Sequence, residues 1–159
     1  DVGSGGSSLT AFLSTKPGEY VALDYDMNAM MQIDRIKETL GLSRLRGVYC
    51  NAKDMSSVFA PNTFNVTISV SVLEHMSKED FKKAVNELVR VTKPNGVILL
   101  TMDISVVPDK DRTDVEDLKW LTEKFGVTIP EVTRTTMINA IQGSSIPFYV
   151  ACLKIQGFK

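Results

Sequence analysis

The feature that most constrains this chain is a glycine-rich stretch at its start, followed at a set distance by a carboxylate. Residues 1–7 are DVGSGGS, and a short apolar run then ends at Asp24. Glycine lets backbone N–H groups approach a ligand closely where a loop opens a helix. A carboxylate at the end of the next strand can accept hydrogen bonds from both hydroxyls of a ribose. Together the two features predict that a nucleoside-containing cofactor binds here.

Length and charge narrow the classes of protein to which the chain can belong. At 159 residues, with 43% hydrophobic and 23% charged residues, it is expected to form one soluble domain over residues 1–159. The formal net charge is −1 and no segment concentrates Lys or Arg, which argues against nucleic acid as a partner. The longest apolar stretches, such as residues 97–100, are too short to cross a membrane.

Cysteine and histidine usage gives no sign of a metal site. Cys50 and Cys152 lie in apolar, strand-like runs, where a free thiol packs as a small hydrophobe. The chain has one histidine and none of the spacings typical of zinc ligands. We therefore expect two buried cysteines, no bound metal and a reducing, cytoplasmic location.

Strand-like and helical segments alternate along the chain. Apolar spacing and capping residues predict helices over residues 7–14, 27–40, 77–92 and 113–125. Apolar and β-branched runs predict strands over residues 20–23, 48–50, 64–72, 97–101 and 148–155. Thr113 and Glu116 predict a capping box for the last helix, and residues 93–96 predict a break before the fourth strand. This alternation is typical of an α/β fold, a parallel sheet with helices on both faces.

Polar residues follow the ends of several predicted strands. They are Asp1, Asp24, Asn51, Asp54 and the segment 71–76. The carboxyl ends of parallel strands meet at one edge of a sheet, where ligands of such folds bind. We therefore expect these residues to converge on one binding site.

Each of these residues also has a purely structural interpretation. Asp24 could cap the helix that begins near Met27, although its spacing from the glycines favours the ribose contact. Asn51 could offer its carbonyl to an adenine amino group, whereas Asp54 could cap the turn after it. Tyr25 could cover an adenine ring or simply be half-buried.

The candidate catalytic residues are His75 and its neighbour Glu74. His75 is the only histidine, and it lies in a strand-to-helix loop at the predicted ligand edge. An imidazole can act as a general base near neutral pH. An ordinary hydrogen-bonding role remains open for both side chains.

An ordered set of five segments carries a family resemblance. The segments are DVGSG (1–5), VALD (21–24), NAKDM (51–55), FNVTISVSVLEHM (64–76) and LVRVTKPNGVILL (88–100). In this order they resemble the class I S-adenosylmethionine-dependent methyltransferases. The chain is most similar to the small-molecule branch that includes the ubiquinone and menaquinone biosynthesis methyltransferases, and the resemblance covers residues 1 to about 103.

The resemblance implies a Rossmann-like fold, S-adenosylmethionine as the cofactor and a small-molecule methyl acceptor bordered by residues 73–76. It also implies that the strand at residues 148–155 is antiparallel, with Cys50 and Cys152 too far apart for a disulfide. The residues expected to contact the cofactor are Asp1, Gly3, Gly5, Asp24, Tyr25, Asn51, Ala52, Ser69 and Ser71. Among them, Asp1 would hold the ammonium group of the cofactor, and Asp24 would bind the ribose.

The chain departs from the family in three places. Ser7 replaces the third loop glycine of the family, and Asn51 replaces the acidic residue that usually follows the strand predicted at residues 48–50. The strand that should precede the glycine loop is absent, so we expect an N-terminally incomplete domain whose open position is covered by self-association or by a partner chain.

Two other functions stay open at this point. A nicotinamide dinucleotide enzyme is disfavoured by Asp1 before the glycines and by Ser8 where the last glycine of that motif would stand. A non-catalytic subunit that keeps the methyltransferase fold is the other alternative.

Overall fold

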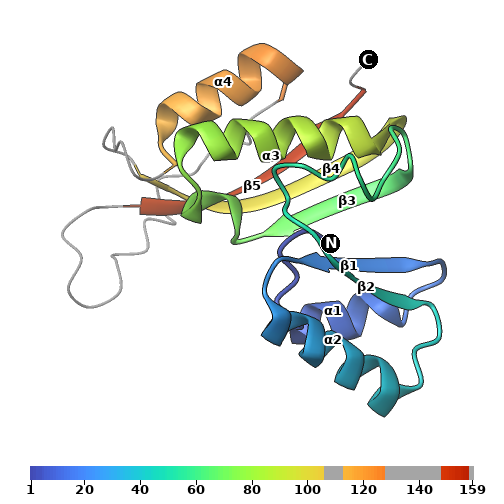
Figure 1. Cartoon of the computed structure of the whole chain (residues 1–159). Helices are drawn as coiled ribbons and strands as arrows, with labels where there is room; N and C mark the ends of the chain where they lie inside the picture. The colour runs from blue at the N-terminus through green and yellow to red at the C-terminus, as the bar shows by residue number, and fades with distance from the viewer. Residues whose placement is uncertain (106–112, 128–147, 158–159) are drawn as a thin grey trace.

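Helices and strands alternate in the computed structural model, which describes residues 1–105, 113–127 and 148–157. The helices are α1 (Ser8–Ser14), α2 (Met27–Leu40), the 3₁₀ turn η1 (Leu73–His75), α3 (Lys78–Val91) and α4 (Val115–Phe125). The strands are β1 (Tyr20–Asp24), β2 (Leu45–Tyr49), β3 (Phe64–Val70), β4 (Thr92–Ser105) and β5 (Phe148–Gln156). The predicted α/β class is confirmed (Figure 1).

The strands form two hydrogen-bonded groups. In the first, β1 and β2 are parallel; in the second, β4 lies between a parallel β3 and an antiparallel β5. The antiparallel final strand agrees with the sequence-based expectation. The fold is therefore a Rossmann-like, mostly parallel sheet with one reversed strand.

Residues 1–3 lie between the two groups of strands and join them. Val2 forms a parallel bridge with Leu23, and its N–H donates to the Ile68 carbonyl at 2.8 Å. The N–H of Gly3 donates to the Leu23 carbonyl, also at 2.8 Å. The position that was expected to lack a strand is thus occupied at its carboxyl end by this short extended segment.

The two sides of β1 face different helices. Ala22 packs with Met30 and Ile33 of α2, whereas Leu23 belongs to the larger core that contains Phe81 of α3. Successive side chains of a strand point to opposite faces of a sheet. Helices therefore cover both faces, as predicted, with α2 on one face and α3 on the other (Figure 1).

Several predicted strand boundaries were wrong: both ends of β2, both ends of β4, and the end of β3, which stops at Val70 rather than at residue 72. β2 begins at Leu45, where it pairs with Tyr20, and it ends before Cys50 rather than at it. β4 begins at Thr92, although residues 93–96 were expected to form a break between the preceding helix and a strand that begins at residue 97. Thr92 pairs with Phe64, and a register shift just after Phe64 accommodates the extra residues of β4 as a bulge.

The cap of α4 lies one residue later than predicted. Asp114, not Thr113, has the extended backbone of the N-cap, and its carboxylate accepts from the Glu116 N–H at 2.8 Å. Asp117 completes the capping box by accepting from the Asp114 N–H at 3.1 Å. The buried Asp114 carboxylate also pairs with Lys78 at 2.7 Å, which ties the start of α4 to the start of α3.

The expectation of two buried cysteines holds for one of them. Cys50 is buried, but Cys152 is exposed because it lies on the face of β5 opposite the buried Leu153. Both thiols are free, in agreement with the expected absence of a disulfide between them.

Two glycines of the first loop make a matched pair for mutation. Gly3 has a φ of 71°, and a Cβ added there would lie 2.5 Å from the Val72 side chain. Gly5 has a φ of 59°, but an added Cβ would meet no atom of the described residues within 4 Å. Gly5→Ala is expected to cost about 1–2 kcal/mol from its left-handed backbone alone. Gly3→Ala adds a collision with a stiff β-branched side chain, roughly a further 1–3 kcal/mol.

Urea unfolding of the two variants measures this difference in stability. Equal losses for Gly3→Ala and Gly5→Ala would show that the contact with Val72 does not constrain the loop.

Candidate functional site

Four loops meet at the carboxyl-end edge of the parallel strands. They follow residues 1–3, β1, β2 and β3, as the sequence predicted. Direct contacts link them: the Gly5 N–H donates to the Asp24 carboxylate at 2.9 Å, and the Cys50 N–H donates to the Asp24 carbonyl at 2.9 Å. Gly3 in turn packs closely against Val72, beyond the end of β3. These contacts bring together the loops that were predicted to form one site.

Asp24 is the centre of this edge. Its side chain is 8% exposed and accepts three backbone N–H groups, from Gly5, Tyr25 and Asp26, at 2.8–3.0 Å. The alternative role of capping α2 belongs to Asp26, whose carboxylate accepts from the Asn28 N–H at 2.8 Å. A carboxylate offers about four lone-pair positions, so Asp24 keeps capacity for a further donor.

The glycine loop turns through three positive-φ residues, Gly3, Gly5 and Gly6. Gly6 packs against α2, where an added Cβ would lie 2.5 Å from Cβ of Gln32. Gly5 is the exception, because its outer side faces open space. The loop is therefore anchored on its inner side by two glycines and accessible at the third, as expected of a loop whose backbone approaches a ligand.

Asp1 lies against the α1 side of the sheet. Its carboxylate accepts from the Tyr20 hydroxyl at 2.7 Å and from the Thr10 hydroxyl at 3.3 Å. Burial raises the pKa of Tyr20 to about 12, so this hydroxyl stays a donor at neutral pH. This contact could not be predicted from the sequence, where Tyr20 is only the first residue of an apolar run.

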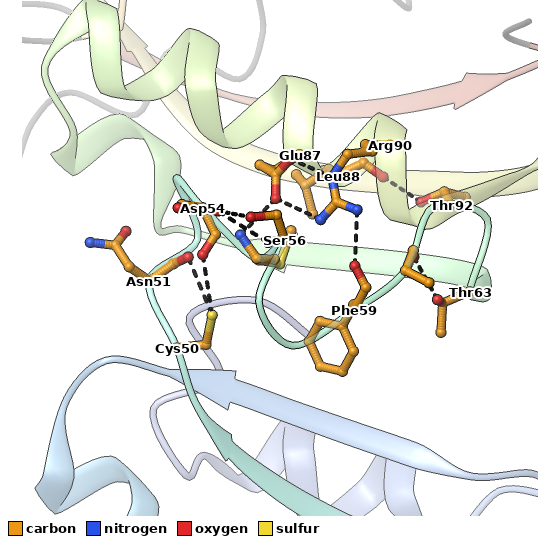
Figure 2. A network of polar contacts seen from close by, with 12 residues as sticks. Cys50, Asn51, Asp54, Ser56, Phe59, Thr63, Glu87, Leu88, Arg90 and Thr92 are labelled. Carbon is orange, nitrogen blue, oxygen red and sulfur yellow. Dashed lines mark hydrogen bonds and ion pairs between the residues drawn. The ribbon is translucent and has the colours of Figure 1, made fainter.

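The loop after β2 carries Asn51 and Ala52, which were predicted to contact adenine. Asn51 is exposed, and its side-chain carbonyl accepts from the Lys53 N–H at 3.0 Å, whereas Ala52 is buried. Asp54 accepts from the Ser56 N–H at 3.1 Å, which is the turn-capping role considered for it. Figure 2 shows this loop beside α3, with the Asn51 side chain directed away from the helix.

The end of β3 combines an orphaned polar atom with unusual backbone. Ser69 is buried, and its hydroxyl oxygen has no hydrogen-bond partner among the described residues. Ser71 is exposed and has a φ of 53°, a conformation that costs a non-glycine residue about 1–2 kcal/mol. Strain of this kind concentrates at ligand sites, so it fits the predicted place of Ser71 beside the cofactor.

The two candidate catalytic residues face different surroundings. His75 is exposed, whereas Glu74 is 7% exposed and lies near β4, with one oxygen 3.4 Å from the Asp103 N–H. The other Glu74 oxygen has no partner among the described residues. Burial raises the pKa of Glu74 above its ordinary value. His75 is therefore the more accessible of the two to an acceptor molecule.

Sequence reasoning missed a polar network behind the β2–β3 loop. Glu87 and Arg90 of α3 bind the backbone of this loop at Met55 and Phe59 (Figure 2). A Glu and an Arg three residues apart are common on exposed helix surfaces. Their spacing therefore carried no signal for a contact more than thirty residues away in the chain.

The described residues contain neither a group of three or more potential metal ligands nor a helix long and apolar enough to span a membrane.

Glu74 gives the site a pH-dependent contribution to stability. Since folding raises its pKa, the folded state binds this proton more tightly, and the contribution is lost as pH rises through the raised pKa. Glu74→Gln removes the burial of a charge, so the variant is expected to be more stable than wild type at pH 7. The two proteins should converge near pH 3, well below the ordinary glutamate pKa, where Glu74 is protonated in both states.

Urea unfolding at both pH values tests this expectation. Glu79→Gln, at an exposed glutamate of α3, is the control and should change stability by less than about 0.5 kcal/mol. A Glu74→Gln variant less stable than wild type at pH 7 would contradict a buried carboxylate that disfavours its own charge.

Known proteins are similar to this chain in sequence or in fold. A relative from Haemophilus influenzae, called an uncharacterized protein, is 31% identical over 112 residues, which are 70% of this chain and 43% of that protein. The chain spans less than half the length of the curated relatives it matches.

Two solved structures show the same fold. The YcgJ protein of Bacillus subtilis superposes with a TM-score of 0.76 at 12% identity, covering 100% of this chain and 91% of that one. The 1,6-didemethyltoxoflavin-N1-methyltransferase of Burkholderia thailandensis, solved with S-adenosylhomocysteine, gives 0.65 at 15% identity, with coverages of 98% and 69%.

The family is established by sequence. Residues 1–100 match the methyltransferase domain family, and this match includes the glycine loop, Asp24, the β2–β3 loop and the end of β3. This chain therefore belongs to the methyltransferase domain family.

Proposed function

We propose that this chain binds S-adenosylmethionine at the carboxyl-end edge of its sheet and transfers the methyl group to a small-molecule acceptor. The observation that carries the proposal is the contact between Asp24 and Gly5, in which a buried carboxylate lies beside an accessible glycine loop. The family match supports the reaction class. A small acceptor is what the resemblance of the sequence segments in residues 1–100 to the quinone-biosynthesis methyltransferases implies.

Asp24 is assigned to the ribose hydroxyls. Its three backbone contacts fix the orientation of the carboxylate without using all of its lone pairs. Gly5, with open space outside it, is assigned to the methionyl part of the cofactor, together with Gly3. Tyr25 is 65% exposed beside Asp24, where its ring can cover the adenine face.

The remaining contacts follow from the other loops. Asp1, held by the Tyr20 hydroxyl, is assigned to the ammonium group of the cofactor, and Asn51 with Ala52 to the adenine. The orphaned Ser69 hydroxyl and the strained backbone of Ser71 support a contact between the end of β3 and the methionyl group.

Catalysis in this scheme depends mainly on orientation. S-adenosylmethionine supplies a methyl group already activated by a positive sulfur. The chain has to align the acceptor with that methyl group, an effect that is worth several kcal/mol in well-oriented reactions. Residues 73–76, which follow the strained Ser71, are assigned to the acceptor side, and the exposed His75 is assigned the role of accepting a proton from a hydroxyl acceptor.

Thermal unfolding with S-adenosylhomocysteine tests the cofactor assignment, with NAD as the control ligand. A ligand at about 100 times its dissociation constant stabilises a protein by about 2.7 kcal/mol. For a domain of this size the midpoint is expected to rise by about 5–11 °C. NAD should leave it unchanged, because Asp1 lies where a dinucleotide phosphate would be repelled.

The other outcomes distinguish the alternatives. A shift with NAD alone would support the dinucleotide enzyme, and no shift with either ligand would support the non-catalytic relative.

His75→Ala tests the base role. With an oxygen acceptor, the single-turnover rate is expected to fall by about 10²–10⁴-fold, the usual contribution of a general base. Affinity for S-adenosylhomocysteine should not change, because His75 is not assigned to the cofactor. An unchanged single-turnover rate would remove His75 from catalysis, and an amine acceptor, which needs no base when neutral, is the matched control substrate.

A further inference from the structure

The β2–β3 loop, residues 50–63, contains no helix or strand and depends on α3 for its shape. Its middle is buried, with Met55 0% exposed and Phe59 4% exposed. A loop that runs this close to a core must satisfy its backbone groups with side chains or other backbone. Figure 2 shows that α3 supplies two of those side chains, Glu87 and Arg90.

Glu87 holds the loop at Met55. Its carboxylate oxygen Oε2 accepts from the Met55 N–H at 2.6 Å, a short, charge-assisted hydrogen bond. The Arg90 guanidinium beside it holds the pKa of the Glu87 carboxyl below its ordinary value. The carboxylate therefore remains ionised, and acts only as an acceptor, over the neutral pH range.

Arg90 holds the same loop four residues further on. Its guanidinium binds both oxygens of Glu87, with Nε at 2.5 Å and Nη2 at 2.8 Å, and its Nη1 donates to the Phe59 carbonyl at 2.9 Å. The Glu87 and Arg90 side chains are only 15% and 25% exposed. The pair is thus a single rigid unit that fixes two points of the loop.

The fixed points lie directly beside the predicted adenine contacts. Between Asn51 and Met55 the loop is a tight turn, with the Lys53 N–H bound to the Asn51 side chain and the Asp54 N–H bound to the Asn51 carbonyl at 3.1 Å. Lys53 also reaches Asp80 at the start of α3, at 2.9 Å, but these side chains are 35% and 30% exposed, so this contact is weak. Asn51 is therefore held on one side by the Cys50 N–H, which donates to the Asp24 carbonyl, and on the other side through the turn that ends at Met55.

We propose that Glu87 and Arg90 are positioning residues for cofactor recognition, because they hold the β2–β3 loop so that Asn51 and Ala52 meet the adenine ring. The proposal rests on the proposed function, which assigns the adenine to these two residues. It adds that selectivity for adenine, with its amino group, over other purines depends on a charged pair of α3 that does not itself touch the ligand.

The test compares two ligands that differ only at the purine. S-inosylhomocysteine carries a carbonyl where S-adenosylhomocysteine carries the amino group that Asn51 is assigned to bind. Calorimetric titration of the full chain gives the ratio of their dissociation constants, which is expected to be at least about tenfold in the wild type.

Glu87→Gln and Arg90→Met are expected to bring this ratio to within about threefold of unity, mainly by weakening S-adenosylhomocysteine. Arg90→Lys, which keeps the charge but not the bidentate fork, should give an intermediate ratio. Glu79→Gln, the same change at an exposed position of the same helix, should keep the wild-type ratio. A purely structural role would weaken both ligands by the same factor, because both bind only the folded state.

Amide hydrogen exchange without ligand gives a second measurement. Residues 51–59 should exchange faster in Glu87→Gln while the amides of α3 do not change.

Each contrary outcome overturns a defined part of the scheme. Wild-type selectivity in both Glu87→Gln and Arg90→Met would overturn the positioning role and leave the proposed function standing. A wild-type protein that binds both ligands equally well would overturn the adenine contact and, with it, the positioning role. A wild-type protein that binds neither would overturn the proposed function as well.

Discussion

The acceptance of three backbone N–H groups by Asp24 is the contact on which the rest of the site depends. Gly5 has a left-handed backbone and Tyr25 lies beyond the end of β1, so neither N–H finds a partner in regular structure. One buried carboxylate satisfies both, and the Asp24 carbonyl receives the Cys50 N–H from the next loop. Three loops are therefore fixed by a single residue.

The same solution recurs along this edge. Asp54 accepts the Ser56 N–H, and Glu87 accepts the Met55 N–H. In each case an acidic side chain organises a loop that leads away from a parallel strand. Structural and ligand-binding roles are consequently not alternatives for Asp24, because a carboxylate that orders a loop can still offer its remaining lone pairs to a ligand. The ends of the parallel strands determine where the loops begin, and the carboxylates determine the conformation of these loops through their hydrogen bonds.

Elements with strong local signals could be predicted from the sequence. The bounds of α2 agreed because apolar spacing, an aspartate cap and Gly41 all indicate the same helix. The predicted start of β4 was wrong because Pro94 and Gly96 usually interrupt a strand. In the structure, pairing of Thr92 with β3 and a bulge allow the strand to continue through them. The network of Glu87 and Arg90 could not be predicted, since its partners are joined only by the tertiary fold. The convergence of the strand-end residues could be predicted from the parallel topology, but the hydrogen bonds among them could not.

The contrast between Gly3 and Gly5 has a practical consequence for chemical biology. Most residues that could bind the cofactor also hold the fold, so their substitution confounds affinity with folding. At Gly5 the loss of stability is limited to the left-handed backbone, because a side chain there would project into open space and its N–H would still reach Asp24; asparagine tolerates such a backbone better than other side chains. Position 5 is therefore the natural place to engineer steric selectivity, because a side chain there would exclude the proposed cofactor, and admit a trimmed analogue, without displacing any neighbouring residue that the structure describes.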